Sequence, residues 1–188
     1  PSTAARELRS GRSRFIGMLF SDPSSGFQAK LHHAALEACS EAGYFLAAGL
    51  FDESSPDWSQ QFKDFQRRTR SDNVVLVPPL CDSEALRQEL ASHEIAAVVI
   101  SPSASFADAH TVRMDDYGAA REITQHLLDL GHTRLGHLTG PVGHTASVQR
   151  RAGFEDAIKD HPSAEVREDW IKPGQFRFKE AVASAEAM

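Results

Sequence analysis

FIGMLF, residues 15–20, opens a series of four short apolar runs that decides the fold of this chain. The other three runs are FLAAGLF at 45–51, VVLV at 74–77 and AAVVI at 96–100. Each run has the length and the apolar content of a buried strand, and a helical pattern separates it from the next run. Strands that alternate with helices predict βαβ units, which build a mainly parallel sheet with helices on both faces.

The segments between the runs carry apolar residues at helical spacing. They predict three helices, whose buried faces hold in turn Phe27 and Leu31, then Trp58, Phe62 and Phe65, then Leu86 and Leu90. Ser55 and Asp82 are predicted to cap the second and third helices, because Ser and Asp commonly accept hydrogen bonds at helix starts. Ligands of such sheets bind beyond the carboxyl ends of the strands, which makes Ser21 and Asp22 candidate ligand contacts.

A second lobe of the same kind is predicted to begin near residue 114. Its pattern runs through a helix that ends at Gly131, a strand at 135–138, a helix over 148–158, a linker rich in charge and proline, and a last helix with Phe178 and Val182. So few strands cannot bury their helices, since a two-stranded sheet is marginal alone. We therefore expect this lobe to be incomplete.

Charge restricts where a nucleic acid could bind. The 188 residues hold 20 Lys and Arg against 26 Asp and Glu, a net charge of −6, which disfavours phosphate binding over most of the surface. The basic residues of the N-terminal segment are Arg6, Arg9, Arg12 and Arg14, against a single acidic residue, Glu7. Any contact with nucleic acid is therefore expected in residues 1–14.

Cysteine use and the absence of an export signal favour a cytoplasmic location. Cys39 and Cys81 form no C-x-x-C pair, so we predict two buried thiols in a reducing compartment. The sequence contains no apolar run of about 18 residues, and its first residues lack the apolar stretch of a signal peptide.

The chain lacks the motifs that an enzyme or a metal site would need. His132 and His137 are separated by a turn, and His32 and His33 diverge on a helix, so neither pair predicts a metal site. A G-x-S-x-G elbow, a phosphate-binding P-loop and a dinucleotide-binding G-x-G-x-x-G are all missing after the predicted strands. We expect no enzyme activity and no cofactor.

MDDYGAAREITQHLLDLGHTRLGHLTGP, residues 114–141, resembles the LacI/GalR family of transcription regulators, which carry a D-x-x-x-x-A-x-x-x-x-x-L-x-x-x-G-H-x-x-I-x-x-x-x-G segment. HTASVQRRAGFEDAI, residues 144–158, is similar to the next family segment, which contains R-x-x-G-F/Y. The resemblance implies an α/β fold of the periplasmic-binding-protein-like type I, with two Rossmann-like lobes. The first lobe would span 15–113, and 114–188 would form part of the second.

STAARELRSGRSR, residues 2–14, is similar to the hinge helix that links a helix-turn-helix domain to the effector core in this family. The resemblance implies that Leu8 wedges open a base step in the minor groove. Ala5 would allow close approach, while Arg6 and Arg9 meet phosphates. The alternative is that this segment is a solvated, disordered basic leader.

The resemblance also implies an effector site between the two lobes, with Ser21, Asp22, Phe27, Asp116 and Arg150 as contacts. Arg150 matches the family arginine, and a guanidinium can donate two parallel hydrogen bonds to sugar hydroxyls, a carboxylate or a phosphate. Its alternative role is a surface salt bridge with Glu155 or Asp156, a pairing that Arg151 could also make.

Two of these contacts have structural alternatives. Asp116 matches a family hydrogen-bond acceptor, but an aspartate at a helix start could equally be an N-cap, and Asp115 and Asp116 could divide the two roles. Phe27 matches a position where some relatives place a ring against the effector. Its helical periodicity favours a core position instead.

The function implied is that of a DNA-binding repressor. It would be a homodimer whose first-lobe helices, beginning with 27–42, meet across a twofold axis. Binding of a sugar or glycoside would then alter operator affinity, and the coupling would be reciprocal. Nucleoside-type effectors also occur in the family. The alternatives are a periplasmic sugar-binding protein, which shares hinge-bending closure but requires an export signal, and an enzyme with a Rossmann-like core.

Overall fold

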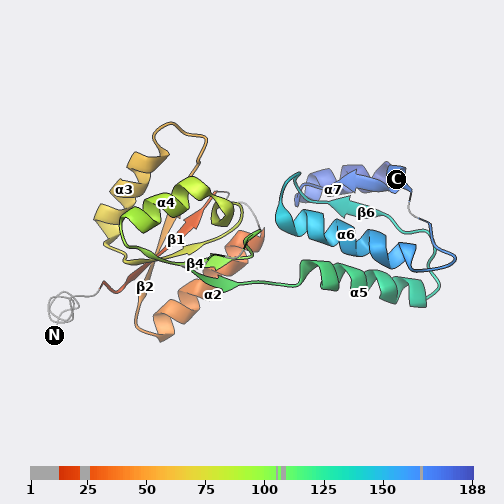
Figure 1. The fold of residues 1–188 in the computed structure, drawn as a ribbon, viewed down its shortest axis with the longest axis horizontal. Coiled ribbons are helices and arrows are strands. Elements are labelled where there is room, and N and C mark those ends of the chain that lie inside the picture. Colours follow the sequence, from red (N-terminus) through yellow and green to blue (C-terminus); the bar gives the residue numbers. More distant parts are fainter. Residues whose placement is uncertain (1–12, 22–25, 105, 107–108, 166) are drawn as a thin grey trace. The chain divides into compact units, whose positions relative to one another are not determined.

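The computed structural model describes residues 13–21, 26–104, 106, 109–165 and 167–188 (Figure 1). The chain divides into two compact units, residues 1–113 and residues 114–188. No helix in these described ranges is long and apolar enough to span a membrane.

Unit 1 alternates strands and helices and forms one parallel sheet. Its elements are β1 (Phe15–Phe20), α2 (Gly26–Glu41), β2 (Phe45–Leu50), α3 (Trp58–Thr69), β3 (Asn73–Leu76), η1 (Leu80–Asp82), α4 (Glu84–Ser92), β4 (Ala96–Ile100) and β5 (His110–Val112). The strand order is β2-β1-β3-β4-β5, and Leu19 of β1 lies between Gly49 and Leu76 of its two neighbours. The predicted parallel α/β fold is confirmed.

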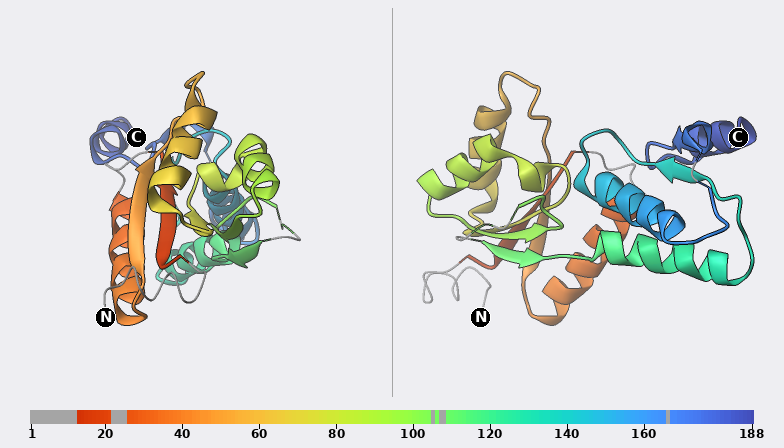
Figure 2. Two further views of the ribbon diagram at one scale, coloured as in Figure 1. Left: turned by 90° about the vertical axis from the view of Figure 1, so that its left-hand side faces the viewer. Right: turned by 45° about the vertical axis from the view of Figure 1, so that its right-hand side comes forward.

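Helices cover both faces of this sheet, as right-handed crossovers require. Figures 1 and 2 show α3 and α4 on one face and α2 on the other. Phe62 and Phe65 of α3 and Leu86 of α4 belong to the larger core cluster. On the opposite face, Leu31 of α2 packs against a smaller cluster that includes Met18. Each fully buried side chain of this size contributes about 1.5–3 kcal/mol of transfer free energy.

The cap predicted at Ser55 is wrong. Residues 52–57 form turns, and Asp52 accepts hydrogen bonds from the backbone N–H (2.9 Å) and the hydroxyl (2.6 Å) of Ser54. The N-cap position of α3 falls on Asp57, whose side chain makes no capping hydrogen bond. The serine signal belongs to a turn because the chain bends there before the helix begins.

The cap predicted at Asp82 is also wrong, by one residue. Ser83 caps α4, and its hydroxyl accepts a hydrogen bond from the N–H of Leu86 at 3.0 Å. Asp82 instead accepts hydrogen bonds from the N–H (2.6 Å) and the hydroxyl (2.8 Å) of Ser103. It therefore links the loops that follow β3 and β4.

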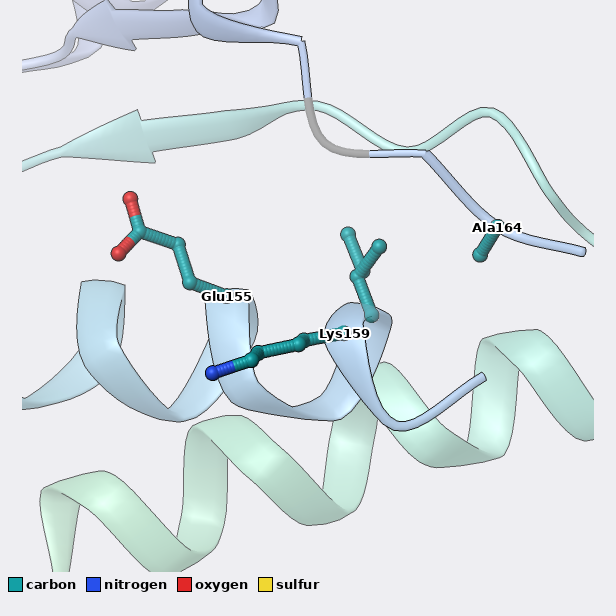
Figure 3. Close-up of a pocket in the computed structure, with 4 residues that line it drawn as sticks. Glu155, Lys159 and Ala164 are labelled. Carbon is teal, nitrogen blue, oxygen red and sulfur yellow. The ribbon is translucent and has the colours of Figure 1, made fainter. Parts of the chain in front are cut away.

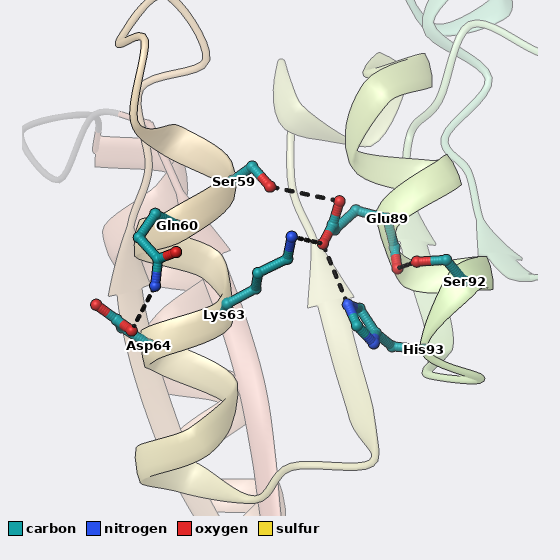
Figure 4. A network of polar contacts seen from close by, with 7 residues as sticks. All are labelled: Ser59, Gln60, Lys63, Asp64, Glu89, Ser92 and His93. Carbon is teal, nitrogen blue, oxygen red and sulfur yellow. Dashed lines mark hydrogen bonds and ion pairs between the residues drawn. The ribbon is translucent and has the colours of Figure 1, made fainter.

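A polar cluster around Glu89 joins α3 to α4 on the outside of the larger core (Figure 4). Glu89 lies 3.3 Å from the ammonium nitrogen of Lys63 and 3.1 Å from Nε2 of His93. Ser59 donates a long hydrogen bond of 3.5 Å to the other carboxylate oxygen. The Glu89 side chain is only 18% exposed, so these contacts are less screened than ordinary surface pairs.

Unit 2 contains a short parallel pair of strands packed between helices. Its elements are α5 (Asp116–Asp129), β6 (His137–Thr139), α6 (Thr145–Lys159), η2 (Glu168–Trp170), β7 (Ile171–Pro173) and α7 (Phe178–Glu186). In Figures 1 and 2, α6 lies between α5 and β6, and α7 lies on the other side of the strands.

Strand β7 was not predicted, because its residues were assigned to a linker. It spans three residues and contains a proline, so it has neither the length nor the alternation that marks a strand. Ile171 pairs with His137 of β6, and the partner strand rather than the local pattern therefore determines its conformation.

The helices α5 and α6 approach each other backbone to backbone at Gly153. A Cβ atom at Gly153 would lie 2.3 Å from the carbonyl oxygen of Tyr117 and 3.0 Å from the nitrogen of Arg121. Two polar contacts flank this point: the Tyr117 hydroxyl donates to Asp156 at 2.9 Å, and Arg121 pairs with Asp160 at 2.9 Å. The glycine of the R-x-x-G-F segment is therefore required by packing.

We predict that Gly153→Ala destabilises unit 2. Alanine favours a helix by about 1 kcal/mol over glycine, but the backbone clash should exceed this gain and leave a net loss of about 1–3 kcal/mol. Urea unfolding followed through Trp170, in a Trp58→Phe background, would measure this. The control is Gly26→Ala, where the new Cβ meets nothing within 4 Å. Equal stability of the two variants would contradict the prediction.

Candidate functional site

Arg150 and Asp116 form an ion pair within unit 2. Asp115 occupies the N-cap of α5 and accepts a hydrogen bond from the N–H of Gly118 at 2.8 Å. Asp116 is therefore not needed as a cap, and its side chain, 5% exposed, turns to α6. Nε and Nη2 of Arg150 both lie 2.7 Å from one carboxylate oxygen of Asp116. The two neighbouring aspartates thus divide the roles of cap and ion-pair partner.

The alternative prediction, a salt bridge from Arg150 to Glu155 or Asp156, is wrong. Arg151 takes Glu155, with Nε 2.7 Å from the carboxylate, and its Nη2 lies 3.1 Å from Glu168. Arg150 is left facing Asp116 because it projects from the side of α6 that α5 covers. These contacts of Arg151 hold η2 against α6.

Phe176, which was not predicted as a site residue, joins this pair. The guanidinium carbon of Arg150 lies 5.8 Å from the centroid of the Phe176 ring, which is within cation–π range. The ring also meets His144 edge to face, with centroids 5.1 Å apart. A Cβ atom at Gly140 would lie 2.1 Å from the ring, so a larger residue there would displace the ring from this position.

The backbone conformation at Phe176 is itself unusual. Gln175 and Phe176 have φ values of 53° and 56°, in the left-handed region that non-glycine residues rarely adopt. Phe176 nevertheless keeps its ring half-exposed beside Arg150. The signal available in the sequence was an aromatic residue two positions after a Pro-Gly pair, which the linker assignment obscured.

In unit 1, the predicted contacts lie at the carboxyl edge of the sheet. Ser21 is exposed directly after β1. Phe27 is 53% exposed in the first turn of α2, so the prediction of a core phenylalanine is wrong. Gln28, which was not predicted, is buried and donates a hydrogen bond of 2.8 Å to the carbonyl of Pro78. It ties the start of α2 to the end of β3.

The remaining predicted contacts lie outside the described residues. They are Asp22 of the effector site and Ala5, Arg6, Leu8 and Arg9 of the hinge segment.

A hollow of about 370 Å³ lies at the C-terminal part of α6, away from the Arg150 cluster. Figure 3 shows Glu155 and Lys159 extending from α6 and Ala164 facing them from the following loop. Ile158 completes the lining, and none of the predicted effector contacts takes part. Opposite charges and an open mouth give this hollow no feature of a specific ligand site.

Neither a metal cluster nor a reactive thiol occurs in the described part of the chain. No group of three or more His, Cys, Asp or Glu side chains there is placed to hold a metal ion. Both cysteines are buried and free, as predicted. Burial and the nearby charge of Asp82 raise the pKa of the Cys81 thiol to about 12, and burial also raises the pKa of Cys39.

His137 is a half-buried titratable group beneath α6. Its ring stacks on Phe154, with centroids 5.0 Å apart and planes 24° from parallel. Burial lowers the pKa of His137, the positive charges of Arg151 and Arg150 lower it further, and Glu155 partly opposes them. The folded state therefore favours the neutral His137 ring over the protonated ring.

The sheet order of unit 1, followed by a second unit that again pairs parallel strands between helices, defines a periplasmic-binding-protein-like α/β fold of type I. A family model described as periplasmic binding proteins and sugar binding domain of LacI family matches residues 13–188. The chain belongs to this family.

The predicted resemblance to the LacI/GalR family is confirmed by curated relatives of this chain. The HTH-type transcriptional repressor PurR of Aliivibrio salmonicida is 26% identical over 190 residues, covering 100% of this chain and 56% of the relative. PurR of Actinobacillus pleuropneumoniae serotype 5b is 30% identical over 181 residues, covering 94% and 52%. The chain thus spans about half the length of these curated relatives.

Solved structures show the same fold. The transcriptional regulator CelR in complex with cellobiose aligns with a TM-score of 0.76 and 22% identity, covering 100% of this chain and 62% of that one. At this identity the likeness establishes the fold alone.

We predict that acid destabilises unit 2 through His137. His137 binds a proton more weakly in the folded state than in the unfolded state, where histidines titrate at about pH 6.5. Stability is therefore lost as the pH falls through that value and levels off below the lowered pKa of the folded state. His137→Leu should remove this loss between about pH 7.5 and pH 5 in urea unfolding followed through Trp170 in the Trp58→Phe background.

The exposed histidine of α5 supplies the control for this measurement. His126→Gln should leave the pH dependence as in the wild type. The same pH dependence in His137→Leu and wild type would refute the assignment.

Proposed function

We propose that this chain is the effector-binding core of a LacI/GalR-type transcription repressor, that its effector is a sugar or glycoside, and that the role is not catalytic. The observation that carries the proposal is the cluster of Arg150, Asp116 and Phe176. A guanidinium fixed by a buried carboxylate donates hydrogen bonds to hydroxyls, and an aromatic ring packs on the C–H face of a sugar. Ser21, Asp22 and Phe27 are proposed as further contacts.

The comparisons support this proposal from two sides. The curated relatives are transcription repressors and match this chain over nearly its whole length. CelR, of the same fold, is in complex with cellobiose, which supports a carbohydrate ligand. A cytoplasmic location follows from the same proposal.

Operator DNA is the proposed macromolecular partner. The contacts would come from Ala5, Arg6, Leu8 and Arg9, together with a helix-turn-helix domain preceding this chain. The basic N-terminal segment contrasts with the acidic remainder, and such a charge distribution directs DNA to that end.

A homodimer through α2 and β2 is part of the proposal. Exposed apolar side chains gather on these elements, namely Leu36 of α2 (46% exposed) and Phe45 and Leu50 of β2 (49% and 59%). The strand β2 is at the sheet edge and carries no charged residue, which is unusual for an edge that stays exposed. A second copy related by twofold symmetry would cover this surface.

The function is tested by fluorescence anisotropy of the full-length regulator with labelled palindromic DNA from its own promoter, against scrambled DNA at the same salt. Specific binding is expected, and Leu8→Ala should weaken it. A responsive sugar from a panel that includes cellobiose should change the operator affinity by about 5- to 150-fold. Arg150→Ala should keep DNA binding but abolish this response.

Arg151→Ala is the matched control, because Arg151 is the adjacent arginine and pairs with Glu155. It should keep both DNA binding and the sugar response. No preference for palindromic over scrambled DNA would overturn the repressor assignment. It would favour a sugar-binding protein of a transport or sensing system.

The dimer surface yields a separate prediction. Leu50→Lys places like charges against each other across a twofold axis, so it should weaken dimerisation at least about tenfold in sedimentation equilibrium. Val112→Lys, at an exposed position on the opposite edge strand β5, should leave the dimer intact. Loss of the dimer in both variants, or in neither, would reject this surface.

A further inference from the structure

The guanidinium of Arg150 is already paired before a ligand arrives. Both of its contacting nitrogens lie 2.7 Å from the same oxygen of Asp116, a residue that is 4% exposed. A carboxylate so buried is poorly screened by water and counterions. The positive charge of Arg150 is therefore balanced from within the fold.

The adjacent arginine, Arg151, adds no uncompensated positive charge. Arg151 is paired with Glu155 and with Glu168, so its charge is also compensated. The Phe176 ring beside Arg150 and the His144 ring beyond it provide aromatic surface. A ligand at Arg150 thus meets hydrogen-bond donors and ring faces without a net positive charge from the two arginines.

Arg150 nevertheless keeps donor capacity for a ligand. A guanidinium has five N–H groups, and Asp116 occupies those on Nε and one on Nη2. The Arg150 side chain is 39% exposed, so the remaining donors can reach a solvent-side acceptor. A hydroxyl oxygen can accept from them at no electrostatic penalty. A phosphate or carboxylate would lie near the Asp116 carboxylate and be repelled.

We propose that Asp116 is a specificity-determining residue that restricts this site to uncharged, hydroxyl-bearing ligands and excludes phosphorylated or carboxylate ones. The inference rests on the proposed effector site, and it names the charge class of its ligand. Asp116 acts through Arg150: it positions the guanidinium and cancels its charge.

The test uses inorganic phosphate as the anionic probe, titrated by calorimetry into the wild-type chain and into Asp116→Asn at low ionic strength. The amide is isosteric and can still accept a hydrogen bond from Arg150, but it leaves the arginine charge uncompensated. Phosphate affinity should rise at least about tenfold in Asp116→Asn, and a further Arg150→Gln substitution should abolish the gain.

Asp156→Asn is the matched control. It removes an exposed carboxylate that accepts a hydrogen bond from Tyr117, and it should leave phosphate affinity unchanged. Equal phosphate affinity of wild type and Asp116→Asn overturns the proposal. The outcome does not depend on whether any sugar binds, so it is distinct from failure of the proposed function.

A measurement on the wild type covers the case in which Asp116→Asn does not fold. The change in the midpoint of thermal unfolding between chloride and phosphate of equal ionic strength should be the same in the wild type and in Arg150→Gln, because it then reflects only the general stabilising effect of phosphate. A stabilisation by phosphate that Arg150→Gln removes would show that Arg150 is open to anions, and would refute the charge filter.

Discussion

The close contact between α5 and α6 at Gly153 is the constraint on which the structure of unit 2 depends. With no Cβ at this position, the backbones meet, and the start of α5 comes within reach of the side chains of α6. Arg150 lies one helical turn before this glycine and can therefore reach Asp116. Any larger residue would separate the helices and draw the two charges apart. A packing requirement thus determines the electrostatics of the candidate site.

The strands and helices of unit 1 could be predicted because each is encoded locally. Apolar runs and stripes such as Phe62 and Phe65 reflect burial that the core confirms. The predictions failed where the conformation of a segment depends on contacts with other parts of the chain. The strand β7 exists because β6 pairs with it, and the serine at position 55 serves a turn. Phe27 fits the helical period but is exposed. The spacing of apolar residues identifies one face of a helix, but it does not show whether another element covers that face.

The candidate site shows the same division between local and distant information. Arg150 and Asp116 could be named from the family segments, but their pairing could not, since Glu155 and Asp156 are nearer in sequence. That pairing depends on the approach of α5 and α6, which brings together two residues 34 positions apart along the chain. Phe176 was missed because its position depends on an unpredicted strand and on a glycine, Gly140, from a distant loop.

The burial of Cys39 and Cys81 has a practical consequence. Alkylating reagents are attacked by the thiolate form of cysteine, and burial disfavours this form in both residues because it raises their pKa values. The native chain should therefore present almost no background to maleimide or iodoacetamide dyes. A cysteine placed on an exposed turn of either unit would be the sole labelled position, and the molecule could carry a fluorophore as a biosensor without prior removal of its own thiols.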